Sequence, residues 1–76
     1  MRTLTTPGGT WKYLVGVEFV KFFAPDGRAF VVSAHDVAGM SASAFDRGRQ
    51  ALTTDGMVTP LRVRCYIDSG KWASLV

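Results

Sequence analysis

The hydrophobic residues in the first half of the chain are arranged in a way that predicts a β-hairpin. Residues 11–23 are dominated by β-branched and aromatic side chains, which favour a strand. Pro25-Asp26-Gly27 is typical of a tight turn, because proline fixes φ and glycine accepts a left-handed conformation. Residues 28–33 then form the returning strand.

This turn pairs Ala24 with Arg28 and thereby assigns the side chains of the hairpin to two faces. One face carries Leu14, Val20, Phe22, Phe30 and Val32. The other face carries Val15, Val17, Phe19, Phe23, Ala29 and Val31. Both faces are apolar, which indicates either strands buried on both sides or a sheet that offers one face to a partner.

A helical segment is predicted after the hairpin. Ser33 and Ser43 each precede an aspartate by three residues, a spacing typical of helix N-termini. Apolar and charged residues then separate onto two faces over residues 43–52, and residues 53–56 end the pattern. We expect a short turn followed by one helix, or one kinked helix.

Residues 61–67 alternate between apolar and polar positions, which predicts a half-buried antiparallel strand. One set consists of Leu61, Val63, Cys65 and Ile67, and the other of Arg62, Arg64 and Tyr66. Pro60 marks the start of this strand, because proline cannot donate to a ladder. A turn at residues 69–70 leads into a short terminal strand at residues 72–76.

The predicted fold is therefore α+β, with an antiparallel sheet of three to four strands and one short helix on one face, in the order ββαβ(β). The 76 residues suffice for a single domain, assigned to residues 11–76. Residues 1–10 are expected to form a flexible N-terminal arm, because Pro7-Gly8-Gly9 favours no regular structure. One short helix cannot cover both apolar faces of the hairpin.

Composition and charge indicate the kind of partner and the cellular compartment to expect. A net charge of +3 favours acidic partners, though only mildly. The single cysteine, Cys65, makes no internal disulfide and fits a reducing compartment. The first ten residues lack the apolar core of a signal peptide, and charged residues interrupt the most apolar run. We therefore expect a cytoplasmic protein with no membrane partner.

The residues that usually carry chemistry are sparse. His35-Asp36 is the nearest approach to a metal-ligand pair, and Cys65 with His35 is the one candidate for a nucleophile and its base. Both are better explained structurally, as a polar helix start and as a small buried hydrophobe. The sequence predicts no catalytic residue, no metal and no cofactor, and hence a non-enzymatic protein.

Two surfaces are candidates for partner binding. Arg62, Arg64 and Tyr66 share one side of a predicted strand near Lys71, where they could stack on bases and neutralise phosphates. Basic residues on a strand also discourage sheet-to-sheet pairing, which is the alternative explanation. The second candidate is the apolar face that contains Val20, Phe22 and Phe30, which would meet a partner or a second copy unless the chain termini cover it.

The chain from Met1, the Pro25-Asp26-Gly27 hairpin, one small helix and the Arg62-Val63-Arg64 strand resemble small phage-encoded accessory proteins. That class includes anti-CRISPR proteins and inhibitors of host polymerase. The resemblance covers most of the chain and rests on size and element order. It implies stoichiometric binding that blocks a host protein or ribonucleoprotein complex in the bacterial cytoplasm. The alternatives are a nucleic-acid-binding module on the basic strand and a small subunit of a larger assembly such as a phage particle.

Overall fold

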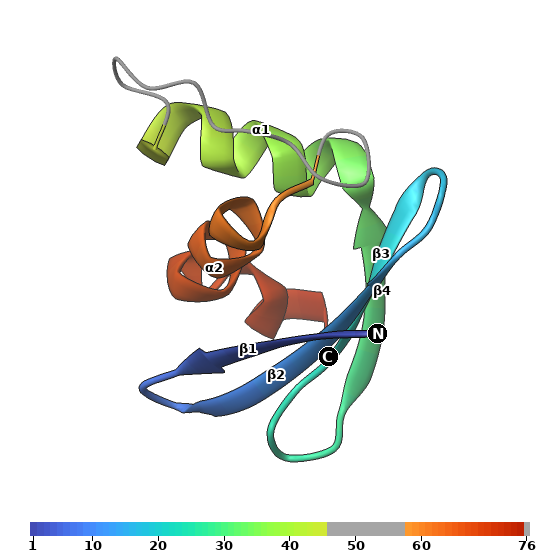
Figure 1. Cartoon of the computed structure of the whole chain (residues 1–76), viewed down its shortest axis with the longest axis vertical. Coiled ribbons are helices and arrows are strands. Elements are labelled where there is room, and N and C mark those ends of the chain that lie inside the picture. Colours follow the sequence, from blue (N-terminus) through green and yellow to red (C-terminus); the bar gives the residue numbers. More distant parts are fainter. Residues whose placement is uncertain (46–57, 76) are drawn as a thin grey trace.

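A computed structural model describes residues 1–45 and 58–75, in which four antiparallel strands form a sheet with helices packed against one face (Figure 1). The strands, in spatial as in chain order, are β1 (Arg2–Thr6), β2 (Gly9–Val15), β3 (Phe19–Phe23) and β4 (Ala29–Ser33). The helices are α1 (Ala34–Phe45), α2 (Pro60–Ser69) and the 3-10 helix η1 (Lys71–Leu75). The predicted α+β class and antiparallel sheet are confirmed, but the order of elements is ββββαα.

The hairpin of β3 and β4 forms as predicted. The N–H of Ala24 donates to the carbonyl of Arg28 at 2.8 Å, and Gly27 adopts a left-handed φ of 93° in the turn. Phe22 pairs with Phe30, and the neighbouring valines pair in the same register. The proline–aspartate–glycine turn therefore sets which side chains share a face.

The predicted single strand over residues 11–23 is wrong, because the chain reverses at residues 16–18 and divides it into β2 and β3. The N–H of Gly16 donates to the carbonyl of Phe19 at 2.7 Å. A Cβ atom at Gly16 would overlap the ring of Phe19. Glycine lets this ring lie against the backbone, and a larger residue would displace the ring.

This reversal changes the face on which two side chains lie. Val15 pairs with Val20 and joins its face, whereas Leu14 pairs with Lys21 on the opposite face. The predicted grouping of Leu14 with Val20 is therefore wrong. The cause is that the reversal pairs odd-numbered residues of β2 with even-numbered residues of β3, whereas a single strand keeps all even-numbered residues on one face.

The first ten residues do not form a loose arm. Residues 2–6 form β1, which pairs with β2 through a turn at residues 7–8. The hydroxyl of Thr6 donates to the carbonyl of Gly9 at 2.9 Å and closes this turn. Gly9 has a φ of 130°, a conformation that other residues rarely adopt.

The helix start predicted at Ser33 is confirmed. The N–H of His35 donates to the hydroxyl of Ser33 at 3.1 Å, and α1 follows directly. A side-chain oxygen at this position satisfies a backbone donor that has no partner within the helix. The second predicted helix, over residues 43–52, lies mostly outside the described residues.

The predicted strand over residues 61–67 is wrong, because residues 60–69 form α2. The helix begins at Thr59, whose hydroxyl accepts from the N–H of Arg62 at 3.2 Å, with Pro60 in the first turn. It ends at Gly70, which takes a left-handed φ of 74°. A proline after a capping threonine and a glycine after the last turn are the usual boundaries of a helix.

The predicted terminal strand at residues 72–76 is also wrong. Residues 71–75 form η1, and the indole N–H of Trp72 donates to the carbonyl of Ile67 at 3.0 Å. This bond turns the C-terminal segment back over the sheet, on the same side as α2.

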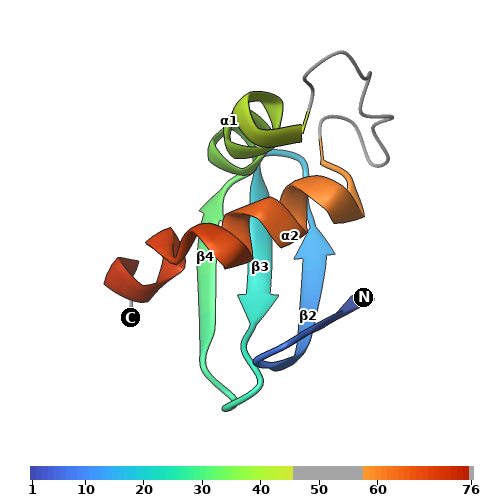
Figure 2. The ribbon, with the colours of Figure 1, turned by 90° about the vertical axis from the view of Figure 1, so that its left-hand side faces the viewer.

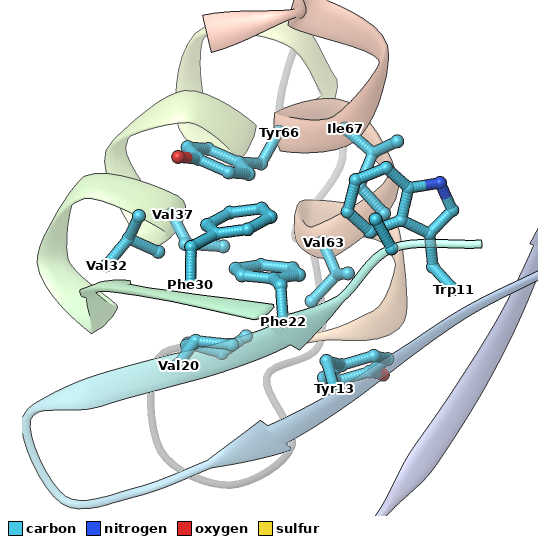
Figure 3. Close-up of a cluster of buried hydrophobic side chains, with 12 residues drawn as sticks. Trp11, Tyr13, Val20, Phe22, Phe30, Val32, Val37, Val63, Tyr66 and Ile67 are labelled. Carbon is cyan, nitrogen blue, oxygen red and sulfur yellow. The ribbon is translucent and has the colours of Figure 1, made fainter. Parts of the chain in front are cut away.

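The core is built around stacked aromatic rings between the sheet and the helices (Figure 3). The ring centroid of Phe22 lies 5.2 Å from that of Tyr66 and 5.3 Å from that of Phe30, with interplanar angles of 20° and 16°. Phe30 stacks in turn on Trp72 at 6.0 Å, and Trp11 meets the stack edge-on. Such pairs contribute about 0.5–1.5 kcal/mol each beyond the apolar area they bury.

Replacing Phe22, which is 0% exposed, tests this core. Phe22→Ala should lower the free energy of unfolding by about 3–5 kcal/mol, because it leaves a cavity in the middle of the ring stack. Phe23→Ala, the neighbouring residue on the opposite face, is the matched control and should cost about 1 kcal/mol or less. Urea denaturation followed by tryptophan fluorescence measures both. Equal losses for the two variants would contradict the assignment of faces.

Candidate functional site

The helices lie on one side of the sheet (Figure 1). The opposite side is a surface of mixed apolar and basic character, here called the outer face. It is formed by the side chains of Lys12, Leu14, Phe19, Lys21, Phe23 and Val31. The strand register places Leu14, Lys21 and Val31 in one row across β2, β3 and β4. Because side chains alternate along each strand, all of them lie opposite the buried core.

The apolar side chains of the outer face are open to solvent. Leu14 is 43% exposed, Phe19 39% and Val31 57%. Val17, at the tip of the turn between β2 and β3, extends this surface. Single exposed apolar residues are ordinary, but a contiguous group on one face is typical of an interaction surface.

The charge of the outer face is positive. The Nζ of Lys21 lies 5.3 Å from the centroid of the Phe23 ring, and Lys12 is paired with Phe23 across the strands. None of the four strands contains an acidic residue. The acidic residues in the described part of the chain occupy turns and helices: Glu18, Asp26, Asp36 and Asp68.

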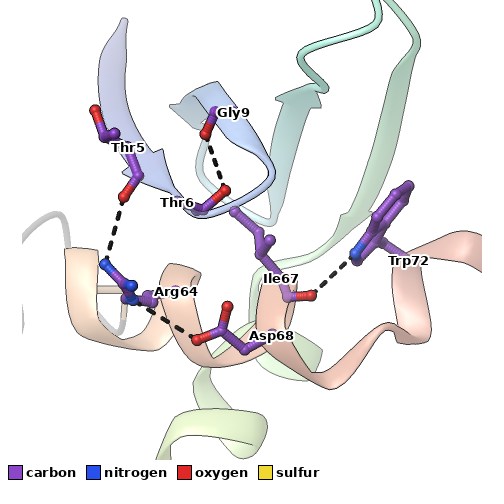
Figure 4. Close-up of polar contacts among 7 residues, drawn as sticks. All are labelled: Thr5, Thr6, Gly9, Arg64, Ile67, Asp68 and Trp72. Atoms are coloured by element: carbon purple, nitrogen blue, oxygen red, sulfur yellow. Dashed lines mark hydrogen bonds and ion pairs between the residues drawn. The ribbon is translucent and has the colours of Figure 1, made fainter.

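The basic strand face predicted from Arg62, Arg64 and Tyr66 does not exist, because these residues lie on α2 and each contacts another part of the fold. The Nη1 of Arg62 donates to the carbonyl of Ala38 at 2.5 Å, which links α2 to α1. Arg64 lies 3.6 Å from Asp68 and approaches β1 (Figure 4). Tyr66 is 4% exposed and belongs to the ring stack.

The apolar patch predicted from Val20, Phe22 and Phe30 is not a surface either. All three are buried, since α2 and η1 cover this side of the sheet. Trp72 lies directly on Phe30, so the C-terminal segment provides part of the cover, as the alternative explanation expected. Lys71 is exposed at the start of η1 and lines a groove together with Tyr66.

Sequence reasoning missed Lys12, Leu14 and Lys21 as members of one surface. The available signal was Gly16, which interrupts an apolar run two residues before Glu18. A turn at that position puts Leu14 beside Lys21 and leaves Phe19 and Phe23 on the same face.

The thiol of Cys65 and the hydroxyl of Tyr66 are both held in their protonated forms. The thiol of Cys65 donates to the carbonyl of Met40 at 3.4 Å, and burial, with a smaller effect of Asp68, raises its pKa above the ordinary 9.0. Burial and the charge of Asp36 raise the pKa of Tyr66 above 10.0. Within the described residues, no three potential metal ligands lie together. A protonated thiol is the opposite of an activated nucleophile.

Compared with known protein families, curated proteins and solved structures, the chain gives no match. No helix in the described part of the chain is long and apolar enough to cross a membrane. The strands and helices define a small α+β protein that has helices on one side of its sheet and an exposed, apolar and basic face on the other.

The raised pKa values predict how stability changes at alkaline pH. Protonated Cys65 and Tyr66 are favoured in the folded state, so their contribution is complete below pH 9 and is lost as pH rises through their raised pKa values. Urea denaturation from pH 7 to pH 10.5 should show a falling free energy of unfolding above about pH 9. In Cys65→Ala, the free energy of unfolding should begin to fall only at a higher pH, where Tyr66 titrates. A curve unchanged by Cys65→Ala would contradict the assignment.

Proposed function

We propose that this chain is a small, non-enzymatic binding protein that docks on another protein through its outer face. The observation that supports this is the exposed group of apolar side chains on β2, β3 and β4, placed between two lysines on a sheet that carries no acidic residue. Burying such side chains removes apolar area from water at about 25 cal/mol per Å². The lysines then select among partners by charge.

The composition of the outer face favours a protein partner over a nucleic acid. Phe19 and Phe23 could stack on bases, but Leu14 and Val31, which flank Lys21 in the central row, are aliphatic and cannot. The two lysines would neutralise about two phosphates, which is a small electrostatic contribution to nucleic-acid affinity. The partner we propose has an apolar surface with acidic residues at its rim, facing Lys12 and Lys21.

The size of the outer face indicates how the partner must sit. Four strands spaced about 4.8 Å apart and about 17 Å long present roughly 300 Å² in projection. Stable complexes bury about 800 Å² on each partner. The partner therefore has to extend beyond the sheet, and the turn at residues 16–18, where Val17 is 97% exposed, is one part of the additional surface. Contact with both surfaces would give the complex a preferred orientation.

The inhibitor role is part of the proposal and rests on the small size shared with phage accessory proteins, because the element order and the strand at residues 62–64 on which the resemblance also relied are not present. A stoichiometric binder of this size would act by covering a surface that its target, a host protein or ribonucleoprotein complex, uses for another contact. The nucleic-acid-binding alternative and the assembly-subunit alternative both require the same face to meet a different occupant, and binding experiments distinguish them.

Matched charge reversals test the proposal. Lys21→Glu alters the outer face, and Arg64→Glu makes the same change in charge on α2, on the other side of the sheet. A nuclease-treated bacterial lysate is passed over the immobilised wild type and both variants, and a protein retained by the wild type is purified and titrated by calorimetry. We expect a defined stoichiometry, with affinity about tenfold weaker for Lys21→Glu and within about twofold of wild type for Arg64→Glu.

Three results would contradict this proposal. Equal weakening by both variants would show that net charge, rather than the outer face, determines binding. Tight binding of a twenty-nucleotide single-stranded DNA or RNA, with a steep loss of affinity in salt, would favour the nucleic-acid alternative. A wild-type protein that self-associates in light scattering and is made monomeric by Lys21→Glu would favour the assembly subunit.

A further inference from the structure

A second binding surface, separate from the outer face, is the free edge of β4. The β3–β4 ladder is fixed at both ends by backbone hydrogen bonds, from Ala24 N–H to the carbonyl of Arg28 at 2.8 Å and from Ala34 N–H to the carbonyl of Glu18 at 3.2 Å. In an antiparallel ladder, every second residue bonds to the neighbouring strand and the residues between them face the other way. The even-numbered residues of β4 therefore bond to β3.

The backbone groups of Ala29 and Val31 consequently point away from the sheet. Among the described residues, neither forms a backbone hydrogen bond outside the β3–β4 pair, and β4 has no strand on its far side. The side chain of Val31 is 57% exposed, so this edge is also open to approach from the outer face. An edge in this state is a template for another strand.

The two edges of the sheet differ in protection. At β1, the guanidinium of Arg64 donates to the backbone carbonyl of Thr5 at 3.4 Å, and the strand itself carries Arg2 (Figure 4). At β4, the sequence Ala-Phe-Val-Val-Ser contains neither a charge nor a proline. Charges, prolines and covering side chains are the devices by which proteins prevent pairing at an edge. The structure therefore protects β1 and leaves β4 competent to pair.

A groove beside β4 offers space for the side chains of an added strand. It has a volume of about 650 Å³ and lies between β4, α1, α2 and η1. Its apolar walls include Val32, Met40 and Leu75, and its charged side chains include Asp36 and Lys71. In Figure 2, η1 reaches past β4 on the helix side, so the helical layer extends beyond the edge of the sheet.

We propose that β4 accepts an extended segment of a partner protein as a fifth, antiparallel strand. The segment would bond to the backbone groups of Ala29 and Val31, and its alternate side chains would enter the groove. A folded second copy is the less suitable occupant, since it would bring its own helical layer into the space beside η1. Because the groove contains charged side chains of both signs, the segment should be apolar at alternate positions and carry one basic and one acidic end.

The probe is a capped heptapeptide, acetyl-Lys-Val-Thr-Val-Thr-Val-Glu-amide, added to the full chain labelled with ¹⁵N. In the free protein, the amides of Ala29 and Val31 should exchange with solvent faster than those of Phe30 and Val32. Peptide at up to about 1 mM should shift the Ala29 and Val31 signals and slow their exchange by at least about tenfold. An analogue that is N-methylated on its threonines should not bind, because the threonine N–H groups face the edge when the valine side chains enter the groove.

A pair of variants at one position separates backbone pairing from side-chain contact. Val31→Pro removes the outward N–H, and an edge strand tolerates proline there because no ladder bond is lost. Val31→Thr keeps that N–H. Val31→Pro should abolish peptide binding, whereas Val31→Thr should retain it within about threefold. If Val31→Pro does not fold, the N-methylated peptide on the wild type decides the same question.

Several outcomes would overturn this inference. Amide shifts confined to Lys12, Leu14 and Lys21 would place the peptide on the outer face instead. Equal binding of the methylated and unmethylated peptides would exclude strand addition. A wild-type protein that forms dimers lost in Val31→Pro would identify a second copy as the occupant. Val31 belongs to the outer face as well as to the β4 edge, so docking through the outer face is tested separately by Lys21→Glu, which leaves the backbone of the β4 edge unchanged.

Discussion

The stack of aromatic rings between the sheet and the helices is the interaction on which the rest of the structure depends. Tyr66 of α2 and Trp72 of η1 reach the sheet by lying on Phe22 and Phe30, which are neighbours across β3 and β4. The C-terminal helices are therefore held to one side of the sheet. With the helical layer on that side, the opposite face and the β4 edge remain available for partners.

The hairpin of β3 and β4 could be predicted from the sequence because its turn residues and its strand composition agree. The turn at Pro25-Asp26-Gly27 sits between two runs rich in β-branched and aromatic residues, and together they determine the register of β3 and β4. The reversal after Val15 has no comparable turn sequence, because Gly16 alone interrupts the apolar run. The ring of Phe19 lies against Gly16, and this contact exists only in the folded hairpin.

The candidate site was misplaced because a short alternating pattern fits two structures. Val63 and Ile67 share a face in a strand and also in a helix, where they are four residues apart. The helix boundaries at Thr59 and Gly70 decide between the two, and they outweigh the alternation. With residues 61–67 helical, Tyr66 turns into the core, and the accessible apolar and basic surface is found on β2 and β3 instead.

Hydroxyl-radical footprinting tests the division of the sheet into a buried and an open face most directly, because it reports the accessibility of each ring separately. In the isolated protein, Phe19 and Phe23 on the outer face should be oxidised rapidly, and Phe22 and Phe30 in the core should be strongly protected. Equal oxidation of Phe22 and Phe23, or protection of all four rings in a monomer, would contradict this division of the sheet.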